Sequence, residues 1–186
     1  MIGTSALIIV LSVFNGLEAL LKSLYGNFDP EIKIVSNHSK YFDDSNVLTD
    51  KLNSINGINV LSKVIEDRAL VSYNNSEIPI YLKGVDSSFY RQNRLENNIV
   101  EGSFIFSNKD MEYVVVGRGV KYKISLNLKD NFNNITLYSI SPNFSFIPGQ
   151  IQKNPFNQLQ VRASGVFAIE QQLDNNYIIS SLNFAK

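Results

Sequence analysis

The pattern of hydrophobic and polar positions is most regular at the start of the chain. An apolar run from Ala6 to Val13 continues without a helix-breaking residue into larger apolar residues spaced alternately three and four positions apart. These residues are Phe14, Leu17, Leu21, Leu24 and Phe28. Such spacing places side chains on one face of a helix, as in a heptad seam. We therefore predict one continuous helix, apolar all round at its beginning and one-sided toward its end.

This first helix allows three interpretations: a signal-peptide core, a buried core helix, or a transmembrane helix whose first half is missing. The mostly apolar stretch, residues 2–14, is shorter than the roughly 20 residues that cross the hydrocarbon core. A signal peptide is disfavoured because no Lys or Arg precedes Lys22. We favour the membrane helix, with residues 1–28 forming its end and a stalk. A soluble binding domain with a buried first helix is the competing hypothesis.

After the helix, short helical patterns interrupt strand-like alternation. Asp29-Pro30 ends the helix, because the residue before proline avoids the helical region. Alternation over Glu31–Val35 predicts a strand. A helix capped by Ser45 follows and closes at Asn56-Gly57. Helix, strand and helix thus precede the main run of strands.

The remaining alternation predicts a sheet. Strands are expected over residues 60–65, 69–73 and 78–82, with turns at Glu66–Arg68 and Asn74-Asn75. The valine run in Glu112–Val116 predicts a strand buried on both faces. Further strands are expected over 133–138, 159–167 and 177–179, and short helices over 87–95, 120–126 and from 182. The fold class is therefore α+β: an N-terminal membrane or stalk helix, then a mixed, largely antiparallel sheet with a few short helices and a projecting loop.

The projecting loop is residues 141–158, which lack a regular period but carry several large apolar side chains. Structureless loops of this length are uncommon in compact domains and usually functional. The loop either folds back onto its own domain or offers these side chains to a partner. The candidate docking residues are Phe144, Phe146, Ile147, Pro148, Gly149, Gln150 and Ile151.

Composition and motifs disfavour catalysis and nucleic-acid binding. Lys plus Arg balances Asp plus Glu at 17 each, so no polyanion is indicated as a partner. The chain has no cysteine, and its one histidine, His38, lacks the companions that a zinc site needs. Gly117-x-Gly119 lacks the third glycine of a dinucleotide fingerprint, because Tyr122 stands there. We expect no enzyme activity, no cofactor and no metal.

Short motifs along the chain resemble those of lipoprotein-releasing ABC permeases of the Lol type. The segment Leu11–Glu18, followed by a helix and Asp29–Ile34, is similar to the point where the first membrane helix of that family enters the periplasm. Further similar motifs follow in the family's order: Leu82–Asp86, Val100–Gly102, Val116–Val120 and Ser164–Phe167. Permeases of the macrolide-exporter type share the same core. They usually have a Gly-Glu-Gly-like segment where this chain has Phe14-Asn15-Gly16, so this segment favours the Lol family.

The resemblance implies a transporter of two permease and two ATPase subunits in the bacterial inner membrane, with this domain in the periplasm. It would extract lipoproteins and pass them to a periplasmic carrier. The implied partners are the ATPase, a second permease subunit, the carrier, the lipoprotein and the membrane. Residues 29–186 would be a periplasmic core domain that is incomplete at its C-terminal end. A related exporter or cell-wall-regulating permease is the alternative within the family.

In one permease of the Lol pair, a hairpin called the hook binds the carrier. By position, residues 141–158 resemble that hook, and Phe146–Gly149 stands where the family has its tip. Gln150-Ile151-Gln152 replaces the Arg-Ile-Pro that often follows. This difference leaves the lipoprotein-receiving permease as the other possibility. The seam from Phe14 to Phe28 would form a stalk that couples ATPase-driven movement to the periplasmic domain.

Overall fold

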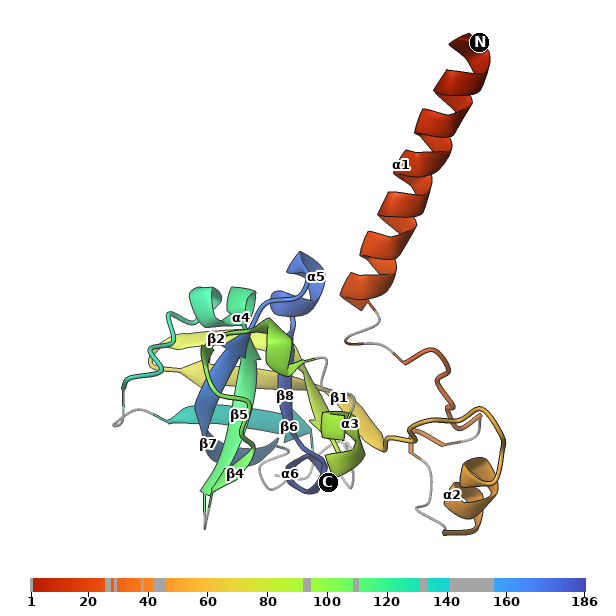
Figure 1. Cartoon of the computed structure of the whole chain (residues 1–186). Helices are drawn as coiled ribbons and strands as arrows, with labels where there is room; N and C mark the ends of the chain where they lie inside the picture. Colours follow the sequence, from red (N-terminus) through yellow and green to blue (C-terminus); the bar gives the residue numbers. More distant parts are fainter. Residues whose placement is uncertain are drawn as a thin grey trace, which may run out of the picture. The chain divides into compact units, whose positions relative to one another are not determined.

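The structure is a computed structural model (Figure 1). It describes residues 2–25, 28, 30–37, 39–41, 46–91, 95–108, 111–130, 134–140 and 156–186. The chain separates into two compact units, Met1–Phe42 and Asp43–Lys186. The boundary expected after residue 28 lies within the first unit.

The first unit consists of a long helix, α1 (Ile2–Tyr25), and an irregular segment. The helix ends earlier than the expected Asp29-Pro30, and Phe28 lies in a turn beyond it. The sequence Gly26-Asn27 follows the last helical residue, and both residue types are poor helix formers that favour helix ends. The prediction that Phe28 continues the helical seam is therefore wrong.

The strand expected over Glu31–Val35 is absent from the described structure, where residues 30–37 have no regular secondary structure. Their apolar side chains are exposed: Ile32 is 79% accessible and Val35 68%. Alternation alone does not make a strand, because an isolated strand leaves its backbone groups without partners. In the described chain, no strand pairs with this segment.

The second unit begins with α2 (Asn46–Asn53). α2 ends three residues before the predicted close at Asn56-Gly57, and the chain then turns, with a φ of 100° at Gly57. The predicted cap, Ser45, lies outside the described residues. The strands are β1 (Val64–Tyr73), β2 (Ser76–Val85), β3 (Ile99–Gly102), β4 (Ser107–Asn108), β5 (Met111–Gly117), β6 (Ile135–Ile140), β7 (Phe156–Phe167) and β8 (Tyr177–Ser181). The remaining helical segments are α3 (Ser87–Arg91), η1 (Glu96–Asn98), α4 (Arg118–Lys123), α5 (Gln171–Asp174) and α6 (Leu182–Ala185).

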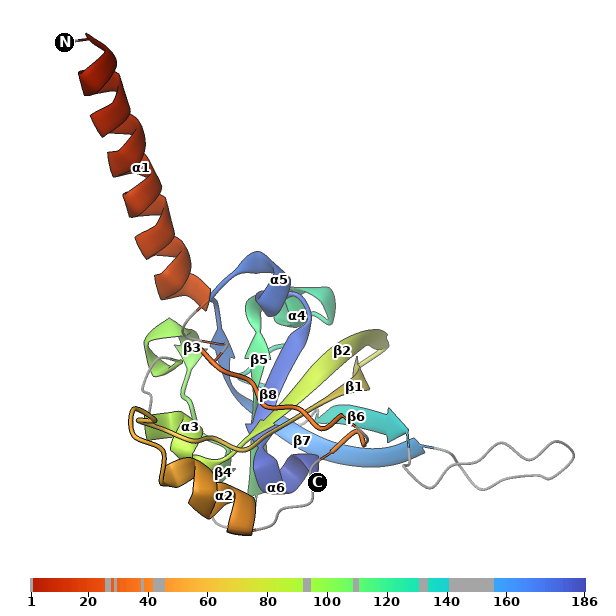
Figure 2. The ribbon, with the colours of Figure 1, turned by 90° about the vertical axis from the view of Figure 1, so that its right-hand side faces the viewer.

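The strands form one mixed sheet in the order β3-β7-β6-β1-β2-β8-β5-β4. An additional pairing of β7 with β5 closes β7, β6, β1, β2, β8 and β5 into a ring. β2 and β8 are parallel, as are β5 and β7, whereas the other pairs are antiparallel. Figures 1 and 2 show β7 curving from its β6 end toward β5. The predicted fold class, an apolar helix followed by a mixed sheet with short helices, is confirmed.

One predicted turn is wrong. β1 runs without interruption through Glu66, Asp67 and Arg68, and every residue from Val64 to Tyr73 pairs with β2. A strand with a partly exposed face accommodates charged side chains there, so a charged triplet alone does not mark a turn. The second predicted turn is confirmed: Asn74 has a φ of 53°, and Tyr73 pairs with Ser76.

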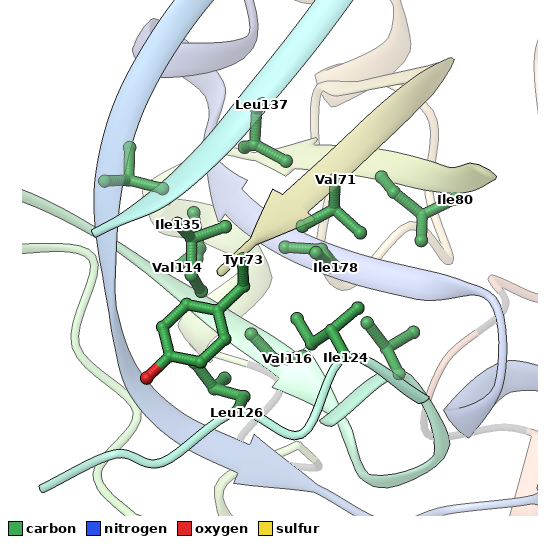
Figure 3. Close-up of a cluster of buried hydrophobic side chains, with 12 residues drawn as sticks. Val71, Tyr73, Ile80, Val114, Val116, Ile124, Leu126, Ile135, Leu137 and Ile178 are labelled. Atoms are coloured by element: carbon green, nitrogen blue, oxygen red, sulfur yellow. The ribbon is translucent and has the colours of Figure 1, made fainter. Parts of the chain in front are cut away.

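The core fills the inside of the ring (Figure 3). Each of the six ring strands contributes at least one buried apolar side chain, and α4 with the residues after it adds three more. Val71 lies opposite Leu137 on β6, and Val116 lies opposite Ile178 on β8. The cluster comprises Val71, Tyr73, Ile80, Val114, Val116, Val120, Ile124, Leu126, Ile135, Leu137, Val161 and Ile178.

β5 is buried on both faces, as its valines predict. Val114, Val115 and Val116 are all fully buried. Val116 packs inside the ring, and Val115 pairs with the buried Ile179 of β8. The second half of β5 is therefore enclosed on both sides, and its end leads into α4.

Candidate functional site

The described residues contain no group of three or more His, Cys, Asp or Glu that could hold a metal ion. In this part of the chain, every buried side-chain nitrogen or oxygen also has a hydrogen-bond partner. The features that bear on function are therefore the exposed helix α1, the β6–β7 hairpin, and the positions of the family-like motifs.

α1 is long and apolar enough to cross a membrane over Gly3–Leu21, a stretch of 19 residues. This span is longer than the apolar run expected from the sequence, because Leu17, Ala19, Leu20 and Leu21 extend it and Glu18 is its only charged residue. Its apolar side chains are exposed: Ile8 is 66% accessible and Val13 65%. By length and composition, α1 meets the requirement for a membrane span.

The predicted stalk seam lies partly on this helix. Phe14 is 66% accessible, Leu17 49% and Leu21 45%. Leu24 belongs to the last turn of α1, but its side chain lies outside the described residues. Phe28 is buried and lies outside the helix. These positions do not test whether the seam couples ATPase-driven movement to the periplasmic domain, so that role stays a prediction.

The predicted docking residues, Phe144 to Ile151, all lie outside the described residues. Their attachment to the domain is described. Residues 141–155 join β6 to β7, and the last residue of β6, Ile140, pairs with the first residue of β7, Phe156. The register then continues without a shift to the pair Ile135–Val161. The candidate loop therefore begins and ends at one end of an antiparallel hairpin.

The glycines of the family-like motifs in the second unit lie where another chain segment approaches the backbone. A Cβ atom at Gly84 would overlap Ala185 of α6, and one at Gly119 would overlap the side chain of Asn175. Gly102 and Gly165 face each other across β3 and β7, and Gly102 has a φ of 75°. These positions need glycine because neighbouring segments leave no room for a side chain.

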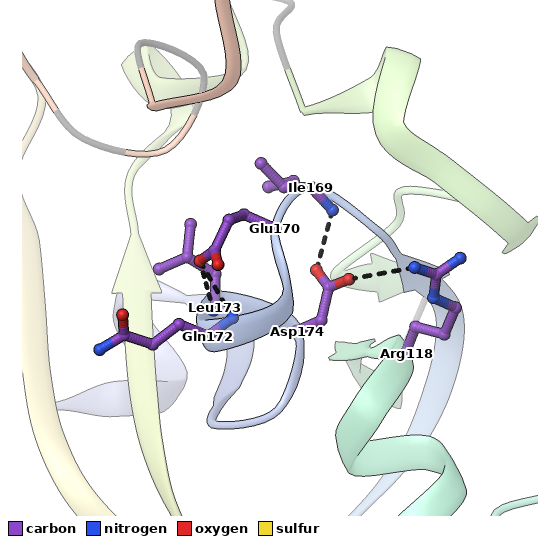
Figure 4. A network of polar contacts seen from close by, with 6 residues as sticks. All are labelled: Arg118, Ile169, Glu170, Gln172, Leu173 and Asp174. Atoms are coloured by element: carbon purple, nitrogen blue, oxygen red, sulfur yellow. Dashed lines mark hydrogen bonds and ion pairs between the residues drawn. The ribbon is translucent and has the colours of Figure 1, made fainter. Parts of the chain in front are cut away.

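α4 and α5 meet at a small polar network (Figure 4). The Asp174 carboxylate accepts a hydrogen bond of 2.8 Å from the Ile169 N–H, and its other oxygen lies 3.7 Å from the Arg118 guanidinium. Glu170 caps α5 by accepting hydrogen bonds from the N–H groups of Gln172 and Leu173. The Lys123 ammonium donates to the Asn175 carbonyl oxygen over 2.8 Å. The network holds the β7–β8 connection against α4.

Asp174 is a buried acid, with a side chain only 4% exposed, whereas the Arg118 side chain is 52% exposed. Burial raises the pKa of Asp174, and the Ile169 N–H and the Arg118 charge offset this rise only in part. The facing Glu170 carboxylate raises the pKa further. The carboxylate therefore ties the start of α5 to the segment after β7 and to α4.

Two other acidic residues of the motifs tie segments together. Asp86 accepts hydrogen bonds from the Ser62 hydroxyl, the Lys63 N–H and the N–H groups of Ser88 and Phe89 in the first turn of α3. Glu101 of β3 pairs with Lys121 of α4. The carboxylate of Asp86 thus fixes the start of α3 and the segment before β1, as an N-cap does.

Inside the ring, the Tyr73 hydroxyl donates a 3.0 Å hydrogen bond to Asp130. Burial raises the pKa of Tyr73, and the Asp130 hydrogen bond raises it further. The hydroxyl therefore stays protonated and ties β1 to the loop after α4. Sequence patterns indicate neither this pair nor Asp174, because both depend on contacts between distant segments.

No protein-family profile matches the chain, and no curated protein matches its sequence. Its structure is similar to the extracellular domain of the noncanonic ABC-type transporter YknZ from Gram-positive bacteria. The TM-score is 0.50 at 12% sequence identity, and the match covers 81% of this chain and 71% of that one. At this identity the similarity shows a shared fold.

Proposed function

We propose that this chain is the extracytoplasmic part of an ABC transporter permease, anchored in the bacterial inner membrane by α1. The single observation that carries this proposal is a fold similar to that of an ABC-transporter extracellular domain on a chain whose first helix contains a 19-residue apolar stretch. A helix of this length and composition suits the hydrocarbon core. The domain would lie in the periplasm, beside a second permease subunit and driven by an ATPase subunit.

We further propose the lipoprotein-releasing role for this permease. Two observations support it. The motifs follow the family's order, and residues 141–155 connect the paired ends of β6 and β7. The loop would bring a periplasmic carrier close to the lipoprotein that the permease extracts. No chemistry at the chain's own residues is needed, so the role is that of a transporter subunit and not of an enzyme.

The test is site-specific photo-crosslinking from position 147 in cells that assemble the whole transporter. Capture of the periplasmic carrier from Ile147, and not from the exposed control position Glu77 on β2, would support the carrier-docking role. Capture of only the second permease subunit would contradict carrier docking and assign this chain to the lipoprotein-receiving role.

A permease of another ABC transporter is the second candidate, favoured by the similarity to YknZ. Reconstituted vesicles distinguish the two. The lipoprotein-releasing role predicts ATP-dependent transfer of a lipoprotein from the vesicle to a soluble carrier. Normal ATP hydrolysis without transfer would favour the other transporter.

A further inference from the structure

We propose that Asn56 is a site of spontaneous deamidation, where the side-chain amide becomes a carboxylate through attack by the main-chain nitrogen of Gly57. The inference is independent of the proposed transporter function. It rests on the residue pair at this position, on the exposure of both residues, and on the hydrogen bonding of the main chain around them.

The reaction uses only the residue pair and water. The Gly57 nitrogen loses its proton and forms a bond to the Cγ atom of Asn56, while the bond from Cγ to the side-chain nitrogen breaks and ammonia leaves. Water then adds to either carbonyl group of the resulting cyclic succinimide. The ring opens to aspartate, or to isoaspartate, in which the main chain runs through the former side chain. Asparagine is a thermolabile residue for this reason.

A glycine directly after asparagine favours ring closure, because it has no Cβ atom to obstruct the approach of its nitrogen. The pair Asn-Gly occurs twice in the chain, at Asn15-Gly16 and at Asn56-Gly57. All four residues are exposed, and a Cβ atom at either glycine would meet nothing within 4 Å. Exposure and space therefore do not distinguish the two pairs.

The main chain does distinguish them. Gly16 lies inside α1, where its N–H donates to the carbonyl group four residues earlier. Gly57 lies beyond the end of α2. Within the described part of the chain, neither the Gly57 N–H nor the side-chain amide of Asn56 makes a hydrogen bond. A bonded N–H must first break its hydrogen bond before the nitrogen attacks, whereas the Gly57 nitrogen is already free.

The turn that contains the pair is weakly held. One backbone hydrogen bond spans it, from the Ile58 N–H to the Ile55 carbonyl oxygen, and its length of 3.4 Å exceeds the common value of about 2.9–3.0 Å. Residues 58–63 then connect α2 to β1 without regular secondary structure (Figure 1). Such segments open locally at little cost, so the Asn56 side chain and the Gly57 nitrogen have the freedom to meet.

Conversion changes the charge of the chain. Lys plus Arg and Asp plus Glu both number 17, so a converted molecule gains one negative charge on a formally neutral chain and separates from the unconverted form by ion exchange. The new carboxylate lies three residues after Asn53, the last residue of α2. A negative charge near the C-terminal end of a helix opposes the helix dipole, so the modification should weaken this end of α2.

Ageing of the complete chain in detergent and heavy-oxygen water, followed by peptide mass spectrometry, tests the inference. Asn56 should convert at least roughly tenfold faster than Asn15, because the free nitrogen needs no local opening. Each converted Asn56 should contain one heavy oxygen atom and yield both aspartate and isoaspartate. The rate should rise with pH, because the attacking nitrogen must lose its proton. Conversion of Asn56 no faster than that of Asn15 would overturn the inference.

A variant with a second pair outside the apolar span separates hydrogen bonding from protection by detergent. In Ser54→Gly, Asn53 also precedes a glycine, and the N–H at position 54 donates to the Asp50 carbonyl oxygen over 3.1 Å. Asn53 should therefore convert about fivefold or more slowly than Asn56 in the folded variant. In urea both should convert at similar rates. Fast conversion of Asn56 in urea alone would show that the fold protects it and overturn the inference.

Asn56→Gln provides the control for the assignment. It keeps an amide at the position, but attack by the next nitrogen would have to close a larger ring, which is slower. The acidic form that wild type develops on ageing should be absent from this variant. Development of the same acidic form by Asn56→Gln at the wild-type rate would assign the charge change to another residue and overturn the proposed site.

Discussion

Gly117 lies directly against the main chain of Asp174, so that a Cβ atom at Gly117 would overlap the Asp174 carbonyl oxygen. The contact joins the end of β5 to α5, two segments that are far apart in sequence. Next to it, Arg118 faces the buried Asp174 carboxylate. Substitution at this contact tests whether α5 packs against the end of β5.

Gly117→Ala should lower the free energy of unfolding by about 1–3 kcal/mol, the usual cost of inserting a methyl group into a packed site. Gly16→Ala is the matched control, because a Cβ there meets nothing within 4 Å. In a helix interior, that change should be neutral or stabilising by about 0.5–1 kcal/mol. Urea unfolding of both variants in detergent measures the difference. Equal stability of the two would show that α5 does not pack on β5 in this way.

Asp174→Asn should change how stability depends on pH. Because burial raises the pKa of Asp174, the folded chain binds this proton more tightly than the unfolded chain does. The contribution to stability is fully present below the ordinary value of about 3.9 and is lost as pH rises through the raised pKa. Asparagine is uncharged throughout, so this loss should vanish.

Unfolding free energies of wild type and Asp174→Asn, measured from about pH 4 to pH 7, test the effect. The variant should gain stability relative to wild type as pH rises. Glu77→Gln, at an exposed carboxylate on β2, is the control for a general change of charge. A difference between Asp174→Asn and wild type that stays constant with pH would contradict a raised pKa at Asp174.

Asp86→Ala should destabilise the second unit by about 1–3 kcal/mol, because it leaves buried or half-buried donors without their acceptor. The donors are the Ser62 hydroxyl and the N–H groups of Lys63 and Ser88, whereas the Phe89 N–H keeps the Asp86 backbone carbonyl as an acceptor. Glu77→Ala removes an exposed carboxylate and should change stability by less than about 0.5 kcal/mol. Thermal unfolding compares the two, and a loss confined to Glu77→Ala would exclude the capping role of Asp86.

Leu21→Asp should uncouple ATP hydrolysis from lipoprotein release if the seam acts as a stalk. Burying a leucine against a partner is worth about 1.5–3 kcal/mol, so release should fall by roughly tenfold or more while the second unit stays folded. Leu20→Asp is the matched control, since it places the same charge one residue away and off the seam. Release and ATPase activity in reconstituted vesicles measure both variants, and equal effects would remove the stalk hypothesis.

Local periodicity was enough to predict much of the fold. The apolar pattern of the first segment predicts α1, the valine run predicts the enclosed strand β5, and Asn74-Asn75 predicts the β1–β2 turn. Each of these features depends on neighbours within a few residues, so the sequence contains the necessary information. The candidate docking loop was likewise recognised from its lack of period, although its residues lie outside the described structure.

Pairing partners and contacts between distant segments were decided by the tertiary structure. Glu31–Val35 alternates but forms no strand in the described chain, whereas Glu66–Arg68 continues a strand in spite of its charges. The closure of the ring between β5 and β7 and the burial of Asp174 likewise depend on which distant segments meet. A strand is stabilised by hydrogen bonds to another strand, and a buried charge by groups from another element. Neither partner is specified by the local pattern, and only the folded chain brings them together.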